Sequence, residues 1–90
     1  MRIKEGFVLR QVCGEWVVVG EGLSAINFNR LLSLNETAAW LWEKAGEIGD
    51  FNTDTLTATL CEEYDVPTED ARQDVSNMIH QWLELGIVEP

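Results

Sequence analysis

Basic side chains are scarce in this sequence. Its 90 residues include six Lys or Arg residues against 16 Asp or Glu residues, which gives a formal net charge of −10. Proteins that bind nucleic acids displace counterions from the phosphate backbone with clusters of Lys and Arg, and the sequence contains no such cluster. We therefore expect no nucleic-acid partner. The dispersed acidic residues indicate solvated helix faces, with a basic partner as the alternative interpretation.

Cysteine and histidine are too few and too far apart to predict a metal site. Cys13 and Cys61 have neither CxxC spacing nor a neighbouring histidine, and His80 is the one histidine. We expect both cysteines to be small buried apolar residues, and His80 to be exposed opposite the apolar stripe of its helix. Motifs for a nucleophile or a phosphate-binding loop are missing as well, so the sequence predicts no catalytic residue, metal or cofactor.

Long apolar runs are also absent. A transmembrane helix needs about 18 consecutive apolar residues, and a signal peptide needs an apolar core near the N-terminus. The sequence has neither feature, so we expect a cytoplasmic protein without a membrane segment. Hydrophobic residues make up 46% of the chain, which is enough for one core. Residues 1–90 are therefore predicted to form a single domain.

The first third of the chain is predicted to form an antiparallel sheet. Residues 7–12 and 15–19 are rich in branched and aromatic side chains, and Cys13-Gly14 between them predicts a hairpin with a two-residue loop. Residues 25–28 alternate in polarity. Residues 30–34 resume an extended apolar pattern just before the first predicted helix.

The remainder is predicted to form three helices. Asn35 and Thr68 are suitable N-caps for the first and third helices, and the second is expected to begin near Thr53. The predicted ends are Gly46 or Gly49, residues 65–67, and Gly86. The expected apolar faces comprise Ala38, Leu41, Trp42 and Ala45, then Leu56, Leu60 and Tyr64, then Ala71, Val75, Met78, Ile79 and Trp82. Ile87-Val88 is expected to be a short final strand.

An antiparallel sheet followed by three helices is an α+β architecture similar to a winged helix-turn-helix. Winged helices that bind DNA present Arg, Lys, Asn or Gln from a recognition helix. The third predicted helix offers one cation, Arg72, among several carboxylates. A winged-helix transcriptional regulator is therefore disfavoured.

An ordered set of motifs extends over nearly the whole chain. After the glycine-turn hairpin come residues 34–43 (LNETAAWLWE), Tyr64-Asp65-Val66, and Leu85-Gly86-Ile87-Val88. In this order they resemble the family of the pyrroloquinoline quinone biosynthesis protein D (PqqD). The resemblance implies a non-catalytic recognition element. Such a domain binds the leader of a ribosomally made precursor peptide and presents it to a modifying enzyme, often a radical S-adenosylmethionine enzyme.

The resemblance also implies where the leader binds. In the family, the leader adds as a strand to the sheet edge and lies in a groove beside the third helix, which here corresponds to residues 30–34 and to one margin of the third predicted helix. The expected peptide-binding residues are Arg30, Leu31, Leu32, Ser33, Leu34, Asp74, Met78, Gln81 and Leu85. Simple core packing is the competing interpretation for Met78 and Leu85.

Trp40 projects opposite the apolar face of the first predicted helix, among charged residues. The simpler expectation is that it packs under the N-terminal segment or under residues 47–52. The alternative is a second contact surface, for the modifying enzyme or for self-association, because aromatic residues are enriched at interfaces.

A different class of function fits the same features. A small structural or regulatory subunit would hold an enzyme complex together without touching a leader. A direct contact between the domain and a leader peptide distinguishes the two interpretations.

Overall fold

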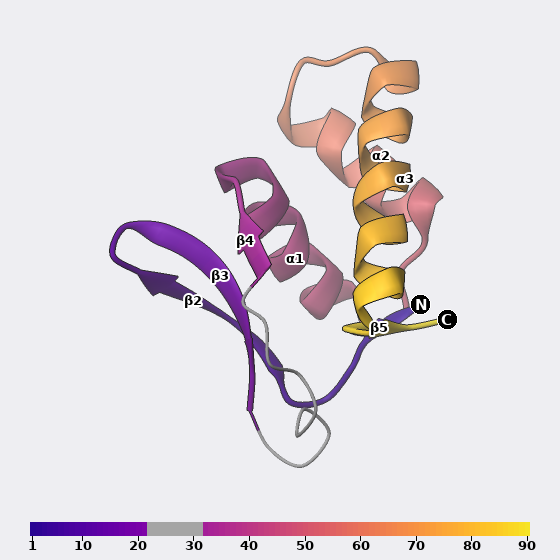
Figure 1. Ribbon diagram of the computed structural model, residues 1–90. Coiled ribbons are helices and arrows are strands. Elements are labelled where there is room, and N and C mark those ends of the chain that lie inside the picture. Colours follow the sequence, from indigo (N-terminus) through magenta and orange to yellow (C-terminus); the bar gives the residue numbers. More distant parts are fainter. Residues whose placement is uncertain (22–31) are drawn as a thin grey trace.

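Most strands precede the helices along the chain, and one short strand follows them, in the computed structural model of the protein, which describes residues 1–21 and 32–90 (Figure 1). The elements are β1 (Arg2–Ile3), β2 (Phe7–Val12), β3 (Glu15–Gly20), β4 (Leu32–Leu34), α1 (Glu36–Ile48), α2 (Thr53–Glu63), α3 (Thr68–Leu85) and β5 (Val88–Glu89). This order confirms the predicted α+β class. The strand expected at residues 25–28 lies outside the described residues.

The β2–β3 hairpin follows from the two residues at its turn. Cys13 and Gly14 both have positive φ angles, 51° and 81°, as a type I′ turn requires. Val12 pairs with Glu15 directly beside that turn. β4 pairs antiparallel with the other side of β3, so the sheet order is β2-β3-β4. β4 is thus an edge strand within the described part of the chain.

The expectation that both cysteines are buried is wrong for Cys13. Its side chain is exposed, because a residue at the tip of a two-residue hairpin has no element packed over it. Cys61 is half-buried and packs against the core from α2.

The first two helices begin at asparagine caps. The Asn35 side chain accepts a hydrogen bond from the Ala38 N–H at 2.8 Å, as predicted. Asn52 and Thr55 form a reciprocal capping box, with both hydrogen bonds at 2.8 Å, which explains why α2 begins at residue 53. α1 ends at Gly49, which has a φ of 85°.

The prediction that Thr68 caps α3 is wrong. Thr68 is the first helical residue, Pro67 occupies the N-cap position, and no side chain caps this end. A proline with φ near −59° leads into a helix without strain, so the turn needs no side-chain cap to start. Gly86 ends α3 in the left-handed conformation, as predicted.

A second, two-stranded sheet joins the ends of the chain. β1 pairs antiparallel with β5, with Ile3 opposite Val88, so the two termini lie side by side (Figure 1). The Met1 ammonium donates hydrogen bonds to Asp50 Oδ1 at 2.8 Å and to the Phe51 carbonyl at 2.7 Å. The extended segment at the C-terminus was expected, but its partner strand β1 was not.

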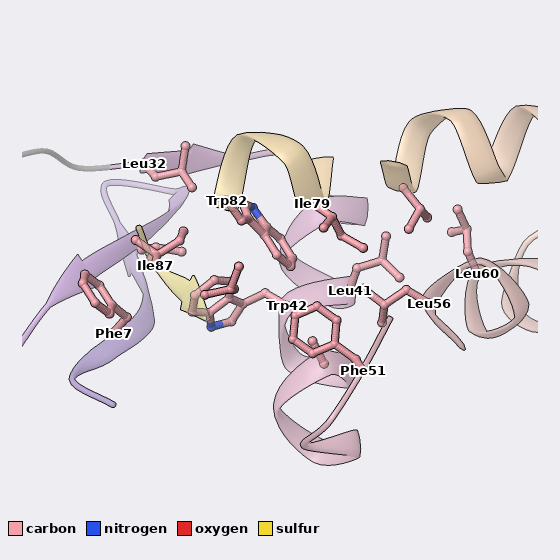
Figure 2. Packing of buried hydrophobic residues seen from close by; sticks show 14 of the residues in the cluster. Phe7, Leu32, Leu41, Trp42, Phe51, Leu56, Leu60, Ile79, Trp82 and Ile87 are labelled. Atoms are coloured by element: carbon pink, nitrogen blue, oxygen red, sulfur yellow. The ribbon is translucent and has the colours of Figure 1, made fainter. Parts of the chain in front are cut away.

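Aromatic side chains from different elements meet in the core (Figure 2). The Trp82 ring lies edge-on to Trp42 and Phe51, with centroid distances of 5.1 and 6.4 Å. Leu56 and Leu60 are buried as predicted. Tyr64 does not share their buried face, because α2 ends before it and its side chain is 36% exposed. No helix in the described residues is long and apolar enough to cross a bilayer.

Candidate functional site

A groove of about 730 Å³ lies between β4 and α3. The start of α1 and the end of α2 contribute Ala38, Leu41 and Leu60 to its lining, and the α2–α3 connection closes its far side. β4 forms one margin through Ser33 and Leu34. The groove therefore runs along β4, the edge strand of the three-stranded sheet as far as the described residues form it.

The direction of the backbone groups in β3 follows from the hairpin. In a two-residue hairpin the pair flanking the loop, here Val12 and Glu15, exchanges both backbone hydrogen bonds. Hydrogen-bonded and non-hydrogen-bonded pairs alternate along antiparallel strands. Trp16 therefore directs its N–H and C=O toward β4, whereas Val17 directs them toward β2.

This alternation leaves one residue of β4 with both backbone groups free to point outward. Ser33 lies opposite Val17, so its N–H and C=O point away from β3. Leu32 and Leu34, opposite Val18 and Trp16, direct theirs into the sheet. The Ser33 side chain is exposed, so nothing bulky covers this position.

α3 forms the opposite wall of the groove. Asp70, Asp74 and Met78 follow one another at four-residue spacing, so they lie in a row on one side of the helix. Ala71 and Val75, both almost fully buried, lie deeper and belong to the core as well. Met78 is half-buried at the end of the row. This wall thus carries carboxylates toward the start of α3, and Met78 with the amides of Asn77 and Gln81 further along.

The α2–α3 connection closes the groove with exposed apolar side chains. Tyr64 and Val66 are 36% and 38% exposed, and Pro67 lines the groove beside them. The Trp40 ring stands edge-on to the Tyr64 ring, with centroids 5.5 Å apart. The Lys44 ammonium lies 5.5 Å from the centre of the Trp40 ring. Trp40 therefore supports a groove residue, a neighbour that the sequence did not suggest.

A second hollow of about 560 Å³ adjoins the groove at the hairpin end of the sheet. Gln11, Glu15, Trp16 and Glu36 contribute to its lining. Both hollows share Ser33, Leu34 and Asn35. The edge of β4 is thus the place where the two hollows meet.

Five of the expected peptide-binding residues line the groove: Ser33, Leu34, Asp74, Met78 and Gln81. Leu32 is instead 9% exposed and belongs to the core, because its side chain is on the inner face of the sheet. Leu85 is half-buried against the core and does not line the groove. Arg30 and Leu31 lie outside the described residues.

The groove residues of the α2–α3 connection and the Asp70 end of α3 were not predicted from the sequence. One signal was available: Val66-Pro67 is an apolar pair in a connection between helices, where polar residues are usual. Among the described groups, a clear pKa shift is found outside the groove, at Asp50. The Met1 ammonium hydrogen-bonded to Asp50 lowers the pKa of that carboxyl group.

Comparison with known proteins gives a family match and two similar folds. Residues 15–88 match the family model described as coenzyme PQQ synthesis protein D (PqqD). The structure of TbiB1 in complex with the TbiA(beta) leader peptide superposes with a TM-score of 0.77 at 16% identity, covering 99% of this chain and 95% of that chain. For lasso peptide synthetase B1 complexed with the leader peptide, the TM-score is 0.73 at 22% identity, with 99% and 96% covered. At these identities the likeness establishes a common fold. No curated protein matches the chain.

Proposed function

The chain belongs to the family of coenzyme PQQ synthesis protein D, and we propose on this premise that its groove binds the leader segment of a ribosomally made precursor peptide. The observation that carries the proposal is the edge of β4, where the backbone of Ser33 points outward beside a groove lined by both apolar and polar side chains. The two proteins of similar fold are both named as complexes with leader peptides, which supports the same role for this chain.

The leader adds as a strand beyond β4. One leader residue hydrogen-bonds to the N–H and C=O of Ser33, and its two neighbours direct their side chains to the face of Leu34, toward the groove. Because Ser33 alone supplies both outward groups among the described residues of β4, the backbone contribution is small. Side-chain anchors between Leu34, Tyr64 and Met78 supply the remaining affinity and the specificity.

Binding of the leader leaves the rest of the precursor accessible to a modifying enzyme. A radical S-adenosylmethionine enzyme is a partner of this kind, and the domain presents the precursor to it without itself catalysing the reaction. We place this encounter in the cytoplasm, where ribosomes release the precursor.

The proposal is tested by an NMR titration of the labelled domain with a synthetic leader from the nearest precursor gene. We expect shifts at Ser33, Leu34, Asp74 and Met78. Ser33→Pro removes an outward-pointing N–H that takes no part in the β3–β4 ladder, so the sheet is retained. Leader affinity should fall roughly tenfold in this variant, because a backbone acceptor of the leader loses its donor.

Ser33→Ala is the matched control, since it keeps the backbone N–H and removes the hydroxyl group. It should bind the leader far more tightly than the proline variant does. A folded Ser33→Pro protein that binds like the wild type would exclude strand addition at this edge. A folded wild-type domain that shows no shifts at high leader excess would favour a structural subunit that does not touch a leader.

A further inference from the structure

The charged side chains that line the two hollows have one sign. Asp70 and Asp74 line the groove, and Glu15 and Glu36 line the second hollow. Neither lining includes a Lys or Arg among the described residues. A peptide that follows the edge of β4 therefore passes four carboxylates.

The two groove carboxylates have no cationic partner in the described part of the chain. Neither Asp70 nor Asp74 forms an ion pair with another described residue, whereas Arg72, on the same helix, pairs with Asp54 on α2. Asp70 and Asp74 are one turn apart, a spacing at which like charges destabilise a helix. Asp70 is in the first turn, where the helix dipole favours it, but Asp74 lies beyond that turn. A cation bound between the two would relieve their repulsion.

We propose that the leader recognised by this chain carries a Lys or Arg that reaches the Asp70–Asp74 row while an apolar side chain enters the groove beside Met78. This inference rests on the proposed function and specifies its ligand. Charge complementarity supports it: the hollows hold only carboxylates among their charged lining residues, and the whole chain has a net charge of −10.

The geometry of α3 sets the spacing of the two leader residues. Four residues of helix advance about 6 Å, so Asp74 lies about 6 Å and Asp70 about 12 Å along the axis from Met78. An extended peptide advances about 3.3 Å per residue. The basic residue is therefore two or four positions from the apolar anchor. Both spacings are even, so the two side chains point to the same face of the added strand.

A displayed library of random 15-residue peptides provides the test. Peptides are selected on the wild-type domain, and those that also bind Ser33→Pro are discarded. We expect the remaining peptides to be enriched in Lys or Arg two or four positions from an apolar residue. Selected peptides without this enrichment would overturn the inference and leave the proposed function intact. If no peptide were sensitive to Ser33→Pro, the proposed function itself would fail, and this inference with it.

Substitutions in the groove distinguish a direct ion pair between the peptide and Asp70 or Asp74 from a general attraction by the net charge of the domain. Asp70→Asn and Asp74→Asn should each weaken a selected basic peptide by roughly threefold, because an exposed ion pair contributes little. Glu69→Gln is the matched control, an exposed first-turn carboxylate outside the groove lining, and should leave affinity unchanged. Equal losses from Glu69→Gln would show that net charge alone attracts the peptide and would overturn the inference.

A charge reversal completes the test. Asp74→Lys should reject the selected basic peptide and accept the same peptide with its Lys or Arg replaced by Glu. Rejection of both peptides by a folded Asp74→Lys domain would count against a direct contact at this position.

Discussion

At the scale of single residues, Thr57 has a buried hydroxyl group that the fold does not use. The side chain is 2% exposed, and its oxygen has no hydrogen-bond partner among the described residues. An unpaired buried polar group costs about 1–3 kcal/mol. Thr57→Val removes the hydroxyl and keeps the branched shape, so the free energy of unfolding in urea should rise by about 1 kcal/mol. Thr57→Ser, which keeps the hydroxyl and loses the methyl group, should destabilise the protein. A less stable valine variant would mean that the hydroxyl is paired.

Trp40 is half-buried against the core, and it reaches the groove through its contact with Tyr64. Its ring supports Tyr64, so Trp40→Ala should weaken leader binding about two- to tenfold, which corresponds to the loss of one aromatic pair. Trp40→Phe retains an edge contact and should lose less. Fluorescence anisotropy with a labelled leader measures both variants. If Trp40 belonged instead to a separate contact surface for the enzyme, Trp40→Ala would spare leader binding and weaken enzyme binding.

At the scale of elements, α2 depends on its capping box. Asn52 and Thr55 satisfy the first backbone groups of the helix, which brings Leu56 and Leu60 into the core. Asn52→Ala should destabilise the protein by about 1 kcal/mol, or about 4–8 °C in Tm, as followed by circular dichroism. Asn52→Ser retains an acceptor and should lose less. An unchanged Tm for the alanine variant would show that tertiary packing alone fixes the start of α2.

Elements with a local cause were predictable from the sequence, and elements that depend on a distant partner were not. Cys13-Gly14 sets the hairpin and Asn35 caps α1 through interactions within a few residues. β1 has two residues and no periodicity of its own, and it exists because β5 pairs with it. Thr68 is a residue type that often caps helices, but Pro67 occupies the N-cap position and Thr68 is the first helical residue.

The candidate site likewise has one wall that was largely predicted from the sequence and one that was not. A projection of α3 located Asp74, Met78 and Gln81 on one wall of the groove, but it also included Leu85, which packs against the core, and it missed Asp70. Tyr64 and Val66 come from a connection without periodicity, and their approach to α3 depends on how α2 packs. The apolar Val66-Pro67 pair marks this connection as unusual, but no local pattern predicts how the connection approaches α3. The ring contact of Trp40 with Tyr64 was missed for the same reason.

At the scale of the whole molecule, the excess of carboxylates affects stability and binding in opposite directions. At a net charge of −10, the acidic side chains repel one another in the compact folded state. Salt screens this repulsion, with a screening length of about 10 Å at 0.1 M. Raising NaCl from about 10 mM to about 0.5 M should therefore increase Tm by a few degrees.

The same salt series should weaken the binding of a basic leader, because it also screens the attraction of the leader to Asp70 and Asp74. Tm is measured by circular dichroism and Kd by fluorescence anisotropy in the same buffers. As salt rises, both Tm and Kd should rise, because the fold becomes more stable and the complex less stable. The Asp70→Asn/Asp74→Asn double variant should keep the rise in Tm and lose most of the salt dependence of Kd. An affinity that rises with salt in the wild type would mean that apolar anchoring alone selects the leader.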